Sequence, residues 1–119
     1  MKLFEFQAKR IFTQYGLPVP ESDLLLSNSD VPKLAFPLVL KAQALTGGRG
    51  KAGGVKICQD KKELSPLLTQ LLNMKIKDEP VRAVLAEEKA EIKQEFYLSI
   101  ALQGGNAQPL LIASRTGGM

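Results

Sequence analysis

The sequence predicts an α+β fold for these 119 residues. Three observations carry the prediction: apolar residues recur at helical spacing near the N-terminus, short apolar runs typical of strands follow, and clusters of Gly, Pro and Asn separate these patterns. The patterns occur in the order helix, strands mixed with a second helix, and a closing hairpin. This order is typical of the α+β class.

The N-terminal residues predict an amphipathic helix. Its apolar positions share the spacing i, i+4, i+7, i+8 and i+11, which forms one helical face: Phe4, Ala8, Ile11, Phe12 and Tyr15. Gly16 follows as a stop signal, and the prolines in 17–20 favour an extended chain. Residues 23–26 indicate a short strand, and 28–32 a turn or the start of a short helix.

The middle of the chain predicts two strands and a second helix. The apolar run 37–43 suits a buried strand, and 55–58 indicates another. A helix is expected to begin at Asp60, because Glu63 lies three residues later in the spacing of a capping box. Its apolar face is formed by four leucines: Leu64, Leu67, Leu68 and Leu71. Residues 73–80 predict a loop.

The last third of the chain predicts one strand and a hairpin. Residues 82–87 indicate a strand, and 95–102 alternate strictly between two faces, which is the cleanest strand pattern in the sequence. Residues 103–106 predict a hairpin turn, with 109–114 as the partner strand. Because an apolar strand has barely ended where the chain stops, we expect a fragment of a longer protein.

Composition excludes several kinds of chemistry. The chain has no histidine, which removes Ser-His-Asp and Cys-His catalysis and histidine metal ligands. Its single cysteine, Cys58, excludes an internal disulfide and a Cys₄ zinc site, and we expect it to be a core residue. No run of 18 apolar residues and no signal-peptide pattern is present, so we expect a soluble protein of the cytosol or an organelle matrix.

A glycine-rich loop is the main candidate for binding. Five of the eight residues 47–54 are glycine, and the surrounding stretch 41–62 carries six Lys or Arg and one Asp. Glycines let backbone N–H groups approach an anion closely, and the cations add attraction. The loop joins two strands, and Lys51 is followed by Ala52, so it is neither a P-loop nor a Rossmann turn. Phosphate binding, a flexible hairpin tip and nucleic-acid binding all remain open from this pattern.

Three charged residues outside the loop are further candidates. Lys41 lies inside an apolar strand, so its ammonium group must reach solvent or find an anion. Glu87 closes one predicted strand and Glu95 opens the next, and their carboxylates could accept hydrogen bonds from sugar hydroxyls or help to hold a metal. Solvated carboxylates at strand ends are the alternative.

The sequence resembles the β subunit of succinyl-CoA synthetase and its NDP-forming acyl-CoA ligase relatives. The resemblance covers essentially the whole chain and is carried by these segments: Leu3–Lys9, Tyr15–Pro20, Lys41–Gln43, Gly47–Lys56, Glu87 and Glu95–Leu98. It implies an ATP-grasp fold, here the N-terminal subdomain (a mixed β-sheet with flanking helices) and the start of the second. The implied division is a leading helix at 1–16, a first subdomain at 17–90 and an opening hairpin at 91–119.

The resemblance also implies a nucleotide site. Lys41 matches the family's phosphate-contacting lysine. The remaining matches are the contacts of the glycine loop, two hinge positions near the base and a second carboxylate of the pocket: Gly48, Arg49 and Gly50, then Glu87 and Ala90, then Glu95. No catalytic residue and no metal ligand is assigned within the chain. The expected cofactors are ATP or GTP, with Mg²⁺ held by ligands outside the chain.

The implied activity is NDP-forming ligation of a carboxylic acid to CoA, a reaction of the tricarboxylic acid cycle when the acid is succinate. The expected partner is an α subunit or α-like domain that carries a phosphorylated histidine, in bacterial cytoplasm or in the mitochondrial matrix. CoA and the acid would bind to the full enzyme, and this chain alone is expected to be inactive. Neither a membrane nor a nucleic acid is an expected partner.

The sequence departs from the family pattern in two places. Residues 44–46 lack the histidine that many members carry before the glycines, and Thr116 replaces a common Glu or Gln. The alternative function is a nucleic-acid-binding module that uses the basic glycine loop. No aromatic residue lies between Lys41 and Lys62 to stack on a base, which weighs against it.

Overall fold

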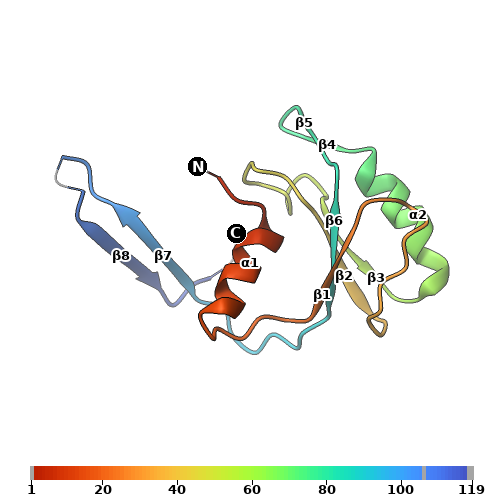
Figure 1. Ribbon diagram of the computed structural model, residues 1–119, viewed down its shortest axis with the longest axis horizontal. Helices are drawn as coiled ribbons and strands as arrows, with labels where there is room; N and C mark the ends of the chain where they lie inside the picture. The colour runs from red at the N-terminus through yellow and green to blue at the C-terminus, as the bar shows by residue number, and fades with distance from the viewer. Residues whose placement is uncertain (1, 106, 118–119) are drawn as a thin grey trace. The chain divides into compact units, whose positions relative to one another are not determined.

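The computed structural model describes residues 2–105 and 107–117. Its helices and strands follow the order shown in Figure 1: α1 (Glu5–Gln14), β1 (Ser22–Leu25), β2 (Leu38–Ala42), β3 (Val55–Cys58), α2 (Lys61–Leu72), β4 (Lys75–Ile76), β5 (Glu79–Pro80), β6 (Val84–Glu88), β7 (Tyr97–Leu102) and β8 (Pro109–Ser114). The predicted α+β class is confirmed. The chain separates into two compact units, Met1–Lys89 and Ala90–Met119.

The first unit is built on a four-stranded sheet with the order β1-β6-β2-β3. All three pairings are antiparallel, whereas the family resemblance led us to expect a mixed sheet. The reason is the position of β6, which lies between β1 and β2 and runs opposite to both. The glycine-rich loop joins β2 to β3 as a hairpin, as its sequence context predicted.

One face of this sheet carries the hydrophobic core. Alternate residues of β2 and β6 point to this face, and α2 covers it with three buried leucines. The central members of the core come from these three elements and the end of β3: Leu38, Leu40, Ala42, Cys58, Leu64, Leu68, Leu71, Val84 and Ala86. Asp60 caps α2 as predicted, because its carboxylate accepts hydrogen bonds from the N–H groups of Lys62 and Glu63.

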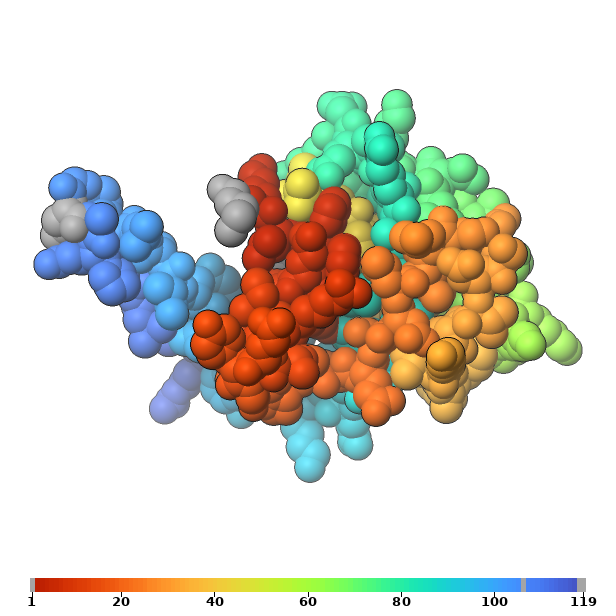
Figure 2. Space-filling view, in the orientation of Figure 1, coloured from red at the N-terminus to blue at the C-terminus, as the bar shows by residue number. Residues whose placement is uncertain are grey.

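Helix α1 lies on the other side of the sheet from α2 (Figure 1). The helix forms where the sequence predicted it, but its apolar stripe is not buried. Ile11, Phe12 and Tyr15 are exposed, and Figure 2 shows the red atoms of α1 at the surface. The helix instead turns Glu5 and Lys9 toward the sheet, where they meet Lys41 of β2 and Glu87 of β6. Among the described residues, no helix has the length and apolarity needed to cross a membrane.

Several element boundaries differ from the sequence prediction. β6 begins at Val84 and includes Glu88, and β7 begins at Tyr97. Residues 73–80, expected to be a loop, contain the short β4–β5 hairpin. Lys77 and Asp78 form its turn with φ of 49° and 68°. Two positive φ values in succession are typical of a tight hairpin turn, but neither residue is the glycine that usually signals one.

The second unit is the predicted hairpin of β7 and β8. The strands pair antiparallel from Tyr97 opposite Ser114 to Leu102 opposite Pro109. The turn was expected at 103–106, of which residue 106 lies outside the described residues. Within this unit the N–H of Gly117 donates to the carbonyl of Glu95 at 3.2 Å. Large apolar side chains are exposed along both strands: Tyr97, Leu98, Ile100, Leu102, Leu110, Leu111 and Ile112.

Candidate functional site

Five charged side chains converge on the α1 side of the sheet. We call them the charged cluster: Glu5 and Lys9 of α1, Lys41 of β2, Arg49 of the glycine-rich loop and Glu87 of β6. They are joined by five ion pairs. Their side chains retain between 6% and 27% of their exposure, so the charges are only partly screened by water. Three cations face two carboxylates, which leaves an excess of positive charge.

Sheet register places Lys41 and Glu87 together. Lys41 pairs with Leu85, and Glu87 pairs with Val39, so the two charged residues are diagonal neighbours on one face. The Nζ of Lys41 lies 2.6 Å from Oε1 of Glu87. Lys9 of α1 donates to the other oxygen of the same carboxylate. Both oxygens of this nearly buried glutamate are therefore occupied by ammonium groups.

Glu5 contacts all three cations of the cluster. Its Oε1 lies 3.2 Å from Nζ of Lys41 and 3.4 Å from Nζ of Lys9. Its Oε2 lies 2.8 Å from Nη1 of Arg49. One carboxylate of α1 thereby connects a strand lysine with the arginine of the loop.

Burial and neighbouring charges shift two pKa values in the cluster. Burial raises the pKa of Glu5, but the charges of Lys41, Arg49 and Lys9 together outweigh it, and the pKa lies below its ordinary value. The pKa of Lys9 is also lowered, first by burial and then by the charge of Lys41, against the opposing effect of Glu5. Glu5 is therefore ionised at neutral pH and available as a partner for the three cations.

The glycine-rich loop is folded on itself. Its turns are closed by N–H···O bonds from Ala52 to Gly48 at 3.0 Å and from Gly54 to Arg49 at 2.8 Å. Gly48 adopts a φ of +90°, a conformation that side chains disfavour. At Gly54 a Cβ would lie 3.1 Å from the carbonyl oxygen of Arg49, so this position needs glycine for close packing. These contacts make an ordered loop rather than the flexible tip that the sequence left open.

The tip of this loop presents donors. Within the described residues, the backbone N–H groups of Gly48, Arg49 and Gly50 donate no hydrogen bond. Nη1 of Arg49 donates to the carbonyl of Ala42 at 3.2 Å, which holds the guanidinium beside the end of β2. Free N–H groups next to a held guanidinium are chemically suited to an anion such as phosphate.

The structure brings several of the predicted site residues together within the first unit. Lys41, Arg49 and Glu87 meet in the charged cluster. Gly48 and Gly50 flank Arg49 in the loop. Ala90 and Glu95 belong to the second unit, and the cluster is built without them.

Sequence reasoning missed Glu5 and Lys9 as site residues. They form an i, i+4 pair of opposite charge, with the glutamate on the N-terminal side, which is a recognised pattern on helices. That pattern would have marked one face of α1 as charged. It would not have revealed that this face meets Lys41 and Glu87.

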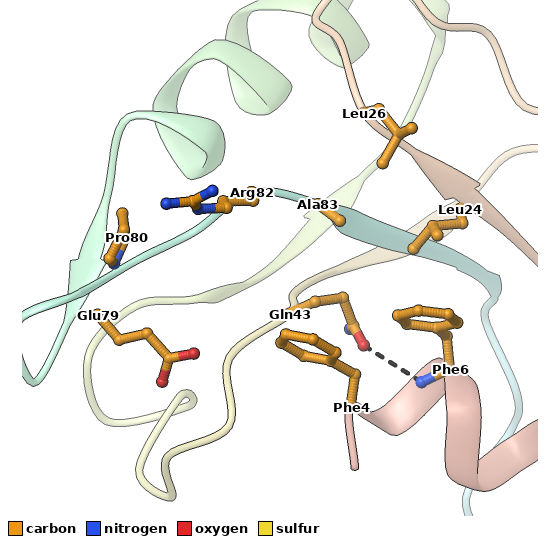
Figure 3. Close-up of a pocket in the computed structure, with 9 residues that line it drawn as sticks. All are labelled: Phe4, Phe6, Leu24, Leu26, Gln43, Glu79, Pro80, Arg82 and Ala83. Carbon is orange, nitrogen blue, oxygen red and sulfur yellow. Dashed lines mark hydrogen bonds between the residues drawn. The ribbon is translucent and has the colours of Figure 1, made fainter. Parts of the chain in front are cut away.

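Beside the cluster lies a mostly apolar cavity of about 440 Å³, drawn in Figure 3, which sequence reasoning also missed. The rings of Phe4 and Phe6 stack there with centroids 5.8 Å apart. Gln43 links the cavity to α1, because its Oε1 accepts from the N–H of Phe6 at 3.2 Å. The lining residues come from α1 and its lead-in, β1, the end of β2 and the β5–β6 segment: Phe4, Phe6, Leu24, Leu26, Gln43, Glu79, Pro80, Arg82 and Ala83.

The described residues contain no group of three or more Asp, Glu, Cys or His side chains that could hold a metal ion. Cys58 is buried in the core, where burial raises the pKa of its thiol and the charges of Glu63 and Asp60 raise it further. A protonated, buried thiol is a poor nucleophile and a poor metal ligand.

Comparison with known protein families identifies the family of this chain. A sequence model of the ATP-grasp domain matches residues 2–119, nearly the whole chain. The chain belongs to the ATP-grasp family. The ATP-grasp fold that the family resemblance implied is thereby confirmed, with an antiparallel sheet in place of the mixed one.

Curated relatives of this ATP-grasp chain are named succinate–CoA ligase [ADP-forming] subunit β. The protein from Aquifex aeolicus (strain VF5) is 45% identical over 130 residues, covering 100% of this chain and 34% of the relative. The one from Methanocaldococcus jannaschii is 44% identical over 121 residues, covering 100% of this chain and 33% of the relative. The chain thus spans about a third of the length of these relatives.

Solved structures show the same fold. The dinucleotide-forming acetyl-coenzyme A synthetase 1 of Ca. Korarchaeum cryptofilum, in complex with coenzyme A, Ca-AMPCP and HgCl+, superposes with a TM-score of 0.81 at 21% identity. That match covers 98% of this chain and 54% of the synthetase. A second structure of the same protein, with coenzyme A, acetyl-coenzyme A and a phosphorylated phosphohistidine segment, gives a TM-score of 0.72 at 21% identity, covering 98% of this chain and 53% of that one. These relatives are ligases and synthetases, and the nucleic-acid alternative finds no support among them.

Proposed function

We propose that this chain forms one half of an ATP clamp and that Lys41 and Arg49 bind the nucleotide phosphates. One observation carries the proposal. A strand lysine and a loop arginine, 3.2 Å and 2.8 Å from the two oxygens of one carboxylate, converge on a single point. Phosphate oxygens accept hydrogen bonds from the same kinds of donor. The unpaired N–H groups of Gly48 and Gly50 would add further donors at this point.

The surrounding residues would support this role. Phosphoryl transfer depends mainly on positioning and on neutralising the charge that is spread over the phosphate oxygens. Lys41 and Arg49 would supply positive charge, and Glu87 would orient Lys41 from the neighbouring strand. Ala90 and Glu95 would take the backbone and carboxylate roles at the nucleoside end that the family resemblance implied. Mg²⁺ would neutralise phosphate charge when bound, with ligands from outside the chain.

We propose further that the whole protein ligates a carboxylic acid, of which succinate is the first candidate, to CoA with formation of ADP. The names of the curated relatives support this reaction, and the synthetase structure in complex with coenzyme A supports CoA as a substrate. The chain has no histidine, so a phosphohistidine would come from an α subunit or an α-like domain. The protein would act in the tricarboxylic acid cycle, in the cytoplasm or a mitochondrial matrix. This chain alone would not form acyl-CoA.

The test is an NMR titration of the 119-residue chain with Mg-ATP. We expect shifts at Lys41 and in the loop 47–54, and a much weaker response in Lys41→Ala. Lys62→Ala is the matched control, because it removes the same charge from the exposed surface of α2. Absence of shifts at millimolar ATP, or an equal response in Lys41→Ala and wild type, would contradict the proposal.

A further inference from the structure

Glu5 occupies an unusual position in the charged cluster. It is the carboxylate that contacts Arg49, and it also contacts Lys41, so both side chains proposed for phosphate binding already hold an anion. The two contacts use different oxygens of one carboxyl group. A phosphate group would present two oxygens to the same lysine and arginine in the same way.

The ammonium group of Lys41 and one guanidinium nitrogen of Arg49 are engaged by acceptors within the chain. Nζ of Lys41 lies within hydrogen-bond distance of Glu5 and Glu87, which uses two of its three donors. Nη1 of Arg49 contacts Glu5 and the carbonyl of Ala42. A phosphate that binds both cations must therefore either share them with Glu5 or displace it.

Sharing is unfavourable because two anions would lie next to each other in a partly buried site. Glu5 retains 19% side-chain exposure, so water screens its charge only weakly. Repulsion between the carboxylate and phosphate oxygens would oppose binding. Displacement avoids this repulsion if Glu5 keeps a partner of its own.

Lys9 is that partner. It lies one turn after Glu5 on α1, with its Nζ 3.4 Å from Oε1 of Glu5. When Lys41 and Arg49 turn to a phosphate, Glu5 can stay paired with Lys9, and no carboxylate is left alone in a partly buried place. The lowered pKa of Lys9, caused first by burial and then by Lys41, fits an ammonium group that gains from losing Lys41 as a neighbour.

We propose that Glu5 takes the place of phosphate in the nucleotide-free chain. It is a positioning residue that holds Lys41 and Arg49 where the anion binds, and its contacts with both cations break when phosphate binds. This inference rests on the proposed function of Lys41 and Arg49. It assigns α1 a role in setting nucleotide affinity. Glu5 keeps the two cations converged without a ligand, and it weakens binding by competing for them.

The sign of one mutational effect tests the inference. Glu5→Gln keeps the shape of the side chain and removes its charge, so ATP should bind about three- to tenfold more tightly, equivalent to about 0.6–1.4 kcal/mol. Adenosine, which lacks phosphate, should bind Glu5→Gln and wild type equally. Glu63→Gln is the matched control, since it removes one carboxylate charge on α2 at the opposite face of the sheet. Damage to the fold would lower the affinity for ATP. A higher affinity of Glu5→Gln therefore distinguishes competition by Glu5 from a merely structural role of this residue.

Affinities would be measured by calorimetry on the 119-residue chain, with spectra confirming that each variant is folded. Unchanged or weaker ATP binding by a folded Glu5→Gln, while wild-type binding depends on Lys41, would overturn the inference and leave the proposed function intact. Lack of ATP binding by the wild type would overturn both. If Glu5→Gln does not fold, the wild-type protein decides through the pKa of Glu5, measured by carboxyl NMR with and without ATP.

That pKa should rise when ATP binds, because Glu5 loses the charges of Lys41 and Arg49 that hold its pKa down. Lys9 and Glu87 are the other titratable groups that face the site, and Lys9 alone would remain as a cation beside Glu5. A Glu5 pKa that is the same with and without saturating ATP would overturn the inference.

Discussion

Removing Glu87 should destabilise the first unit far more than removing its neighbour Glu88. The Glu87 carboxylate is 6% exposed and pairs with both Lys9 and Lys41, whose side chains are 16% and 22% exposed. Glu87→Ala leaves two ammonium groups close together with only Glu5 to neutralise them. Loss of one partner of a buried ion pair costs about 3–5 kcal/mol. Because the lysines are partly exposed and retain Glu5, we expect about 2–3 kcal/mol.

Urea denaturation of the 119-residue chain measures this cost. With a slope of about 1.5 kcal/mol per molar urea, the midpoint of Glu87→Ala should fall by about 1.3–2 M. Glu88→Ala is the control on the same strand, since Glu88 is exposed and its side chain accepts one hydrogen bond, from the N–H of Glu21 at 3.3 Å. We expect it to cost less than about 0.5 kcal/mol. Equal costs for Glu87→Ala and Glu88→Ala would refute the cluster as a source of stability.

Three further predictions concern the core, the loop and the charge of Glu5. Leu68→Ala should lower the free energy of unfolding by about 2–5 kcal/mol, because Leu68 of α2 is 0% exposed in the core. Gln70→Ala on the exposed side of the helix is the control, and a loss below about 1 kcal/mol for Leu68→Ala by urea denaturation would contradict the packing. Gly54→Ala should destabilise the β2–β3 hairpin, because the new Cβ would lie 3.1 Å from both the Arg49 carbonyl oxygen and Cδ1 of Ile76. Gly47→Ala is the control, since a Cβ there meets nothing within 4 Å, and equal thermal unfolding midpoints of the two variants would argue against the close approach. Burial raises the pKa of Glu5, but the charges of Lys41, Arg49 and Lys9 lower it below 4.5. The ionised Glu5 therefore contributes stability above the unfolded-state pKa, and this contribution is lost as the pH falls through the folded-state pKa. The stability difference between wild type and Glu5→Gln, followed by denaturation from neutral pH downward, should therefore shrink in acid, and a difference that is as large in acid as at neutral pH would contradict the pairing.

Local patterns predicted most of the secondary structure. Asp60 caps α2, and β8 has the limits expected for the partner strand of the hairpin, because a helix cap and a hairpin turn depend on residues close in sequence. The β4–β5 hairpin was missed because Lys77 and Asp78 form its turn without a glycine or an Asn-Gly pair. The side of α1 that faces the sheet was also unpredicted, because the apolar stripe that marks a helix does not show which face will meet the sheet.

For the candidate site, the sequence pointed to the right segments and left their geometry open. The five glycines marked the loop, and a lysine in an apolar strand marked Lys41 as needing an anion. The resemblance implied that Arg49 and Glu87 also belong to the site. None of these patterns implied that Lys41 and Glu87 would form an ion pair at 2.6 Å, because that contact depends on the register between β2 and β6.

By itself, then, the sequence determined the class of the fold, the loop between two strands, the absence of histidine chemistry and the family to which the chain belongs. These features depend on composition and on patterns within a few residues, which act at short range along the chain. Only the tertiary structure decided the strand order, the covering of one sheet face by α1, and the meeting of Glu5 and Lys9 with Lys41 and Glu87. The residues of these ion pairs lie 36, 46 and 78 positions apart, and the two pairs of Glu87 depend on the place of β6 between β1 and β2.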